Sequence, residues 1–189
     1  MSVGGGAGYA HLHADAVRLL EGWPAPDAEQ ERLRRELLAH LAVHPDGVAR
    51  SGPPAHLTAS AVLLTEELDA VLLTHHSKAG RWFQLGGHLE AEDASVHAAA
   101  ERETREESGF AGATLLPRPV QLDRHELVGS FGRCREHLDV RFAGTMARSA
   151  HRTPEPDADE ARWWPVDNLP ANTRAELTPL VAAARRALA

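Results

Sequence analysis

The spacing of hydrophobic residues changes from helical to strand-like near Leu57. Between Asp27 and His44, leucines recur at the interval that places them on one face of a helix. Asp27 and Gln30 form a capping pair that predicts where this helix begins. The apolar face is expected to contain Leu33, Leu37, Leu38 and Leu41. The chain is therefore predicted to carry an amphipathic helix ahead of its strands.

Short apolar runs follow. LTASAVLL and AVLLTHH are separated by the polar segment TEELD, which predicts a β-hairpin, and RWFQL is expected to form another strand. Gly86 and Gly87 then predict a turn before a helix from about Ala94 to Ser108. Gly109 comes next, where a left-handed cap is favoured.

The second half returns to strands and ends in a helix. PVQLDRHELVGSF, EHLDVRFAGTM and ARWWPV are expected to be strands, and a final helix is expected to start near Thr178. The polar segment ARSAHRTPEPDADE is expected to be a loop. This order indicates an α/β protein whose mixed sheet is covered by helices on both faces.

The chain length suits a single domain with an N-terminal addition. For 189 residues we expect a flexible tail at 1–10, a helical segment packed on the domain at 11–50, and the main domain at 51–189. No apolar run approaches the roughly 20 residues of a membrane span, and the N-terminus resembles no secretory signal. A cytoplasmic location without membrane association is the resulting expectation.

The net charge of the chain indicates which class of molecule it can bind. A formal charge of −7 argues against broad binding to nucleic acid, which depends on clustered basic residues. It allows phosphorylated small molecules, because a bound cation reverses the local field. The placement of the carboxylates therefore becomes the central question.

Three acids share one face of the helix that precedes Gly109. At about 100° per residue, Glu103, Glu106 and Glu107 fall within an arc of roughly 100°. They continue a stripe that is otherwise apolar, formed by Val96, Ala99 and Ala100. A solvated acidic surface is one interpretation, with Arg102 and Arg105 offsetting the repulsion.

A metal site is the other interpretation. Like charges at this spacing repel, and acids in the last turns of a helix oppose its dipole. Stability alone does not select such an arrangement. Because oxygen ligands suit hard cations, the three carboxylates predict binding of Mg²⁺ or Mn²⁺.

The segment GHLEAEDASVHAAAERETREESGF resembles the Nudix signature G-x5-E-x7-R-E-U-x-E-E-x-G-U, where U is a bulky apolar residue. The loop is one residue longer than the signature, with Asp93 instead of Glu, and Asp93 is expected to cap the helix. Thr104 stands where the signature has a bulky residue. The strands around the segment extend the likeness from about Leu57 onward.

The resemblance implies a Nudix-type α/β/α sandwich with an N-terminal helical extension. It also implies roles: Glu106 and Glu107 as metal ligands, Glu103 as ligand or general base, the Gly86 carbonyl as a further ligand, and Arg102 as the residue that holds the acids. Glu103, Arg102 and Glu107 are thus the expected catalytic group.

The implied reaction is hydrolysis of the diphosphate linkage in a nucleotide sugar, a dinucleotide or a modified nucleoside triphosphate, with Mg²⁺ or Mn²⁺. Family members often recruit a further acid, for which Glu160 is the candidate and Asp157 and Asp159 are rivals. A non-catalytic nucleotide sensor and a diphosphate isomerase are the alternatives. The isomerase is disfavoured because Cys134 lies after the signature.

Other residues give weaker indications. Trp82, His76 and Arg141 are candidate substrate contacts, although Trp82 is also expected to pack in the core and the polar face of HLDVRF is more simply half-solvated. The twelve histidines show no HExxH motif or paired Cys and His spacing, so a zinc site is disfavoured and most are interpreted as surface residues. A homodimer contact is one use for the N-terminal helices.

Overall fold

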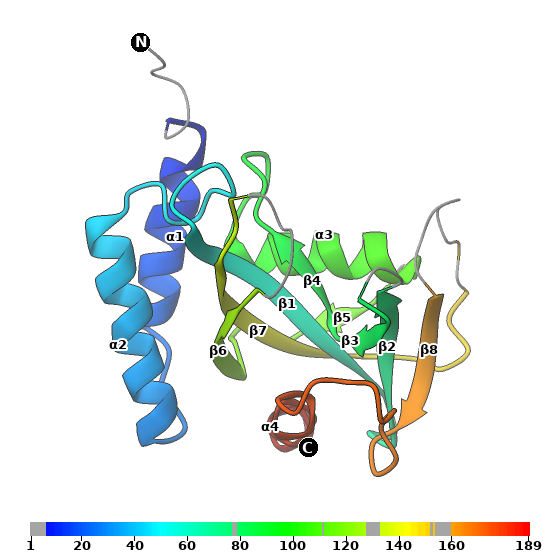
Figure 1. Cartoon of the computed structure of the whole chain (residues 1–189). Helices are drawn as coiled ribbons and strands as arrows, with labels where there is room; N and C mark the ends of the chain where they lie inside the picture. Colours follow the sequence, from blue (N-terminus) through cyan, green and yellow to red (C-terminus); the bar gives the residue numbers. More distant parts are fainter. Residues whose placement is uncertain (1–6, 77–78, 111, 128–132, 152, 154–159) are drawn as a thin grey trace. The chain divides into compact units, whose positions relative to one another are not determined.

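The computed structural model describes the chain except residues 1–6, 77–78, 111, 128–132, 152 and 154–159. The helices are η1 Ala7–Tyr9, α1 Ala10–Glu21, α2 Ala28–Val43, α3 Val96–Ser108 and α4 Leu177–Leu188 (Figure 1). The strands are β1 Ala55–Thr65, β2 Ala70–His76, β3 Arg81–Phe83, β4 Leu85–His88, β5 Thr114–Leu115, β6 Gln121–Glu126, β7 Glu136–Met146 and β8 Glu160–Pro165. Within the described ranges, no helix is long and apolar enough to cross a membrane.

The strands form one eight-stranded sheet, in which the order β3-β2-β1-β7-β5 is joined by β4 on β1, β6 on β7 and β8 on β2. The predicted hairpin of β1 and β2 is confirmed, since the two strands are antiparallel with Leu63 opposite Leu72. The predicted turn at Gly86 and Gly87 is wrong, because both glycines lie inside β4. The two-residue strand β5 was not predicted.

Contacts between backbone positions divide the chain into two compact units. Unit 1 contains Met1–Ala59, Gly87–Ala99 and Gln121–Val140, and unit 2 contains Ser60–Gly86, Ala100–Val120 and Arg141–Ala189. This division does not follow the segment boundaries predicted from the sequence. The assignment of 1–10, 11–50 and 51–189 to a tail, a helical segment and a domain stays a prediction.

In unit 1, α1 and α2 lie side by side (Figure 1). The Asp27 cap is confirmed, because the Asp27 carboxylate accepts a hydrogen bond from the Gln30 amide at 2.8 Å. The Gln30 side chain serves a different purpose: its Nε2 donates to the Leu122 carbonyl at 3.1 Å, and its Oε1 accepts from the Leu122 amide at 2.6 Å. Gln30 therefore ties α2 to β6.

The same unit holds the segment that enters α3. His11 Nε2 donates to the Asp93 carbonyl at 2.8 Å, and the Asp15 carboxylate accepts from the Val96 amide at 2.8 Å. Asp15 thus satisfies one of the amides left unpaired at the first turn of a helix. Helix α1 contributes directly to the ordering of the loop before α3.

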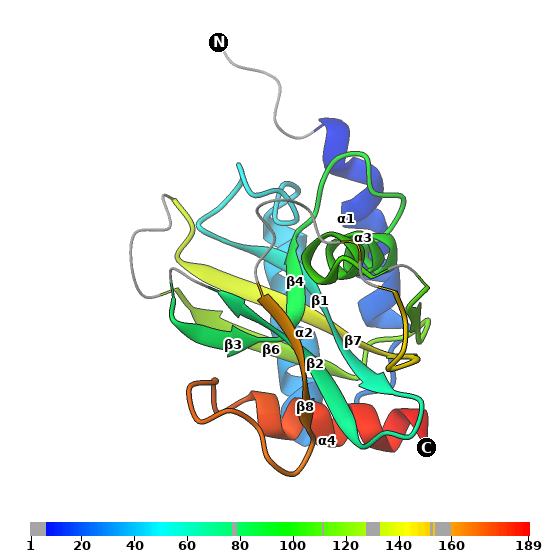
Figure 2. The same ribbon diagram turned by 90° about the vertical axis from the view of Figure 1, so that its right-hand side faces the viewer.

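In unit 2, α4 packs against β1 and β2, with β8 alongside (Figure 2). The core contains Leu64 and Leu73 from the strands and Leu180 from α4, all fully buried. Arg162 lies 4.7 Å over the ring of Trp164 on β8. This packing fixes β2, the strand beside β3 and β8.

The polar positions of β7 are not half-solvated as expected. Asp139 and Arg141 are 3% and 1% exposed, so the alternation of polar and apolar residues does not mark a solvent-facing side. The Asp139 carboxylate accepts a hydrogen bond from the Thr58 hydroxyl at 3.0 Å. The Asp139 carboxylate is therefore paired inside the protein and not solvated.

Substituting Gln30 with alanine is expected to destabilise the protein. The substitution removes both bonds to Leu122 and leaves two buried backbone groups unpaired, at a cost of about 1–3 kcal/mol. The melting temperature should fall by roughly 2–4 °C for each kcal/mol. Calorimetry of Gln30→Ala beside Glu29→Ala, an exposed neighbour on α2, measures the effect. Equal melting temperatures in these two variants would show that the bridge does not contribute.

Candidate functional site

The predicted acidic helix is α3, and its boundaries come from local hydrogen bonds. The Ser95 hydroxyl accepts from the Ala98 amide at 3.0 Å and caps the start of the helix. The expectation that Asp93 is the cap is wrong, because its carboxylate accepts from the Glu90 amide at 2.8 Å and closes the preceding turn. Gly109 ends the helix with φ of 69°, which confirms the predicted left-handed cap.

One face of α3 is buried, as predicted. Val96, Ala99 and Ala100 are almost completely inaccessible to solvent, and so is Thr104 one turn later. Glu103 and Glu107, next to this stripe, are partly buried, while Glu106 is exposed. The carboxylates therefore lie at the border between the protein interior and solvent, where a cation has access to them.

Arg102 connects two of the acids. Its Nη1 donates to Glu103 Oε1 at 3.0 Å and to Glu106 Oε2 at 3.0 Å. The Arg102 and Glu103 side chains are only 14% and 15% exposed, while Glu106 is 50% exposed. The guanidinium thus offsets the repulsion between the two carboxylates and restrains both.

Gly86 holds the third acid. Its backbone amide donates to Glu107 Oε2 at 2.9 Å. The φ of Gly86 is 150°, a conformation that side-chain-bearing residues rarely adopt, so glycine is required at this point of β4. The observed contact is made by the Gly86 amide, whereas the carbonyl was predicted as a metal ligand, and that role stays a prediction.

These contacts all lie within unit 2 and involve five of the predicted site residues, of which Arg102 provides the guanidinium. Glu103, Glu106 and Glu107 offer carboxylate oxygens, and Gly86 adds backbone polar groups. Carboxylate and carbonyl oxygens are the donors that Mg²⁺ and Mn²⁺ prefer. The donor set fits a hard divalent cation.

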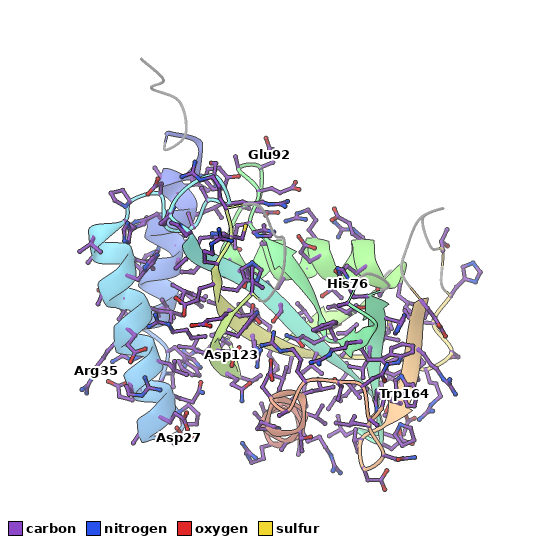
Figure 3. The ribbon with its side chains drawn as sticks, in the orientation of Figure 1. Asp27, Arg35, His76, Glu92, Asp123 and Trp164 are labelled. Atoms are coloured by element: carbon purple, nitrogen blue, oxygen red, sulfur yellow. The ribbon has the colours of Figure 1, made fainter. Side chains whose placement is uncertain are left out.

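The remaining candidates that the structure describes also belong to unit 2. His76 is exposed at the end of β2 (Figure 3), and Glu160 begins β8 opposite His75. Trp82 is 7% exposed and belongs to the core cluster, which supports the alternative expectation of core packing. Arg141 is also buried. Asp157 and Asp159 lie outside the described residues.

A second cluster was missed by the sequence analysis. His56, His88, Cys134 and His137 in unit 1 place one potential ligand atom each within 4.8 Å of one another. The interpretation of the histidines as mostly surface residues is wrong for His56, which is fully buried. The available signal was its position at the head of an apolar strand, where solvent exposure is not expected.

Both the sequence and the fold of this chain are similar to those of known proteins. The model of the NUDIX domain family matches residues 54–184. A hydrolase of the NUDIX family from Clostridium perfringens has a similar structure, with a TM-score of 0.55 and 24% identity over 70% of this chain and 95% of that chain. A search of curated proteins found no match.

Two further solved structures share the fold. The dihydroneopterin triphosphate pyrophosphohydrolase of E. coli gives a TM-score of 0.52 and 17% identity, over 66% of this chain and 91% of that one. An Ap4A hydrolase from C. elegans, solved as a binary complex, gives a TM-score of 0.55 and 14% identity, over 70% of this chain and 96% of that chain. The predicted fold, an α/β/α sandwich with a mixed sheet, is confirmed.

Replacing Thr104 with valine is expected to stabilise the protein. Thr104 is 2% exposed and its hydroxyl has no hydrogen-bond partner within the described structure. A buried, unpaired hydroxyl costs about 1–3 kcal/mol, and valine has a similar shape without it. The melting temperature of Thr104→Val should rise by roughly 2–4 °C or more. Thr104→Ser, which keeps the hydroxyl and loses the methyl group, should fall below the wild type, and a destabilised Thr104→Val would contradict this account.

Proposed function

The chain belongs to the Nudix family, and we propose that it is a Mg²⁺- or Mn²⁺-dependent hydrolase that cleaves the diphosphate linkage of a nucleoside diphosphate derivative. Its membership of the family and its fold make it a Nudix pyrophosphohydrolase. The observation that supports the finer proposal is the acidic face of α3, held by Arg102 and by the Gly86 amide. These contacts keep three carboxylates ready for a cation.

Glu103, Glu106 and Glu107 would hold the metal, together with the Gly86 carbonyl. A bound cation of this kind supplies charge neutralisation of the diphosphate and lowers the pKa of the attacking water. The residues supply position: Arg102 fixes Glu103 and Glu106, and the Gly86 amide fixes Glu107. Because these side chains are already ordered before substrate binds, their conformational entropy is not lost during the reaction.

Proton transfer is assigned to Glu103. Its side chain is largely shielded from solvent and lies against the Arg102 guanidinium, which holds the carboxylate in position. A carboxylate at the edge of a buried face is suited to accept the proton of an attacking water. Glu107 is restrained by a backbone amide instead, which favours a ligand role.

The proposed substrate class is a small phosphorylated molecule. The net charge of −7 supports a cation-bridged small ligand over a nucleic acid. Nucleotide sugars, dinucleotides and modified nucleoside triphosphates share the scissile unit. Exposed His76, at the end of β2, is the candidate contact for the phosphates or the base. The alternative of a diphosphate isomerase has less support, because Cys134 follows the signature in the sequence and its potential ligand neighbours within unit 1 are histidines.

The Glu106→Gln and Glu107→Gln double variant is expected to lose activity. Amides preserve the shape of both side chains but remove the charges that attract the cation, so turnover should fall by at least about 100-fold. Release of phosphate or nucleoside monophosphate from a panel of the three substrate classes, with and without Mg²⁺, measures this. Glu101→Gln is the matched control, an exposed glutamate on the same helix that should keep full activity.

The same panel distinguishes a sensor from an enzyme. If wild-type protein releases no product from any substrate, while a nucleotide raises the melting temperature of both wild type and double variant, the protein is a binding module. Metal-dependent release that the double variant retains would instead show that the α3 acids are not the catalytic group.

Glu160→Gln is expected to lower kcat by roughly 10-fold or more if Glu160 supplies an additional metal ligand. The assignment rests on its position at the first residue of β8, beside His75 of β2. Asp167→Asn, an exposed acid beyond the other end of β8, is the control. Turnover of Glu160→Gln equal to that of this control would remove Glu160 from the site.

A further inference from the structure

The cluster of His56, His88, Cys134 and His137, here called the histidine–cysteine cluster, lies entirely within unit 1. The three imidazole rings form a triangle with centroid distances of 5.0, 5.1 and 5.4 Å. Cys134 Sγ lies 4.0 Å from His88 Nε2. The four residues come from β1, β4, the segment before β7, and β7 itself.

The hydrogen bonding of His56 determines which ring nitrogen is available. His56 Nδ1 lies 3.0 Å from the Pro53 carbonyl, and a carbonyl only accepts, so Nδ1 carries the proton. His56 Nε2 then carries an available lone pair, and this atom is buried without a hydrogen-bond partner. A ring nitrogen fixed by a backbone carbonyl, with the other left open, is the usual arrangement of a metal-bound histidine.

His137 provides a second, independent indication that the cluster binds a ligand. Its Nε2 is also buried and has no hydrogen-bond partner within the described residues. Leaving a buried polar atom unpaired destabilises the folded chain, and this cluster does so at two nitrogens. A ligand that accepts electron pairs from both nitrogens removes that cost, whereas a hydrophobic core does not.

The imidazoles of this cluster are held in the neutral form that binds metals. Burial lowers the pKa of His137 to about 3, and it also lowers the pKa of His56. Cys134 is buried and forms no disulfide, so its thiol is available as a fourth ligand. Three neutral imidazoles and one thiol are the donors that suit zinc and do not suit magnesium.

We propose that His56, His88, Cys134 and His137 bind one Zn²⁺ ion in a structural site separate from the carboxylate site. Four protein ligands complete a tetrahedral shell and leave no position for substrate, which is characteristic of structural zinc. On binding, the Cys134 thiol releases its proton to solvent and the thiolate donates to the ion. Bond lengths of about 2.0–2.1 Å to nitrogen and about 2.3 Å to sulfur place ligands roughly 3.3–3.7 Å apart, so side-chain movements on the order of 1 Å close the cluster.

The proposed ion joins parts of unit 1 that are distant in sequence. It connects the second residue of β1 and the second residue of β7 with the last residue of β4 and with Cys134. Such a cross-link stabilises the folded chain, because the unfolded chain does not hold the four ligands together. The zinc is therefore expected to contribute to folding and not to turnover.

Metal content of the full chain is the first test. Protein purified without added metal, then dialysed against zinc and freed of excess, should contain one zinc per chain by elemental analysis. Cys134→Ser and His137→Ala should each lose it. The proposal is overturned if wild-type protein takes up no zinc, or if both variants bind zinc as tightly as the wild type.

Two controls locate the ion. His125→Gln removes a ring only 5.5 Å from His137, but His125 is engaged with the Asp123 carboxylate at 2.7 Å and lies outside the histidine–cysteine cluster, so zinc should remain. The Glu106→Gln and Glu107→Gln double variant should also keep its zinc. Loss of zinc in this double variant with retention in Cys134→Ser would assign the ion to the carboxylate site and sink the proposal. Zinc content and hydrolase activity are thus independent readouts, so either proposal can fail alone.

Cobalt provides a ligand-specific signature. Co²⁺ in place of zinc should give intense visible bands of a tetrahedral site and a thiolate-to-cobalt absorption in the near ultraviolet. Cys134→Ser should lose the latter. If the variants fail to fold, wild-type protein serves alone: a chelator should lower its melting temperature by on the order of 10 °C, and zinc but not magnesium should restore it. Absence of both the thiolate absorption and this shift would refute the site.

Discussion

The charge on one face of α3 is the constraint on which the candidate active site depends. Glu103, Glu106 and Glu107 repel one another and oppose the helix dipole, so the helix is stable with them only where donors are supplied. Arg102 supplies a guanidinium to two of them and Gly86 supplies an amide to the third. The divalent cation proposed for this site would neutralise the remaining charge, which explains why an arrangement that costs stability suits the proposed catalysis.

That balance places demands on distant parts of the chain. The Gly86 amide reaches Glu107 because β4 adopts a backbone conformation with φ of 150° at Gly86, which excludes larger residues. In unit 1, the loop that follows β4 is anchored by α1, through His11 on the Asp93 carbonyl and Asp15 on the Val96 amide. Helix α1 therefore supports the loop before α3.

The sequence could predict what is local. The hairpin, α2 with its Asp27 cap, the buried stripe of α3 and the Gly109 terminus each depend on residues a few positions apart, and each is confirmed. The extended state of Gly86 and Gly87 depends on pairing with β1, and no local signal distinguishes it from a turn. The histidine–cysteine cluster was not predicted for the same reason. Motif spacing describes zinc sites built from residues close in sequence, whereas His56 and His137 come together only through the sheet.

The two proposed sites differ in the hardness of their donors, and this difference gives each site a preference for a different metal. Carboxylates and a backbone carbonyl favour Mg²⁺ or Mn²⁺, whereas imidazoles and a thiolate favour Zn²⁺. Strand β4 carries a residue of each set, Gly86 and His88, two positions apart. Because donor type and not distance along the chain selects the ion, one short strand can contribute to a proposed zinc site and to a proposed magnesium site.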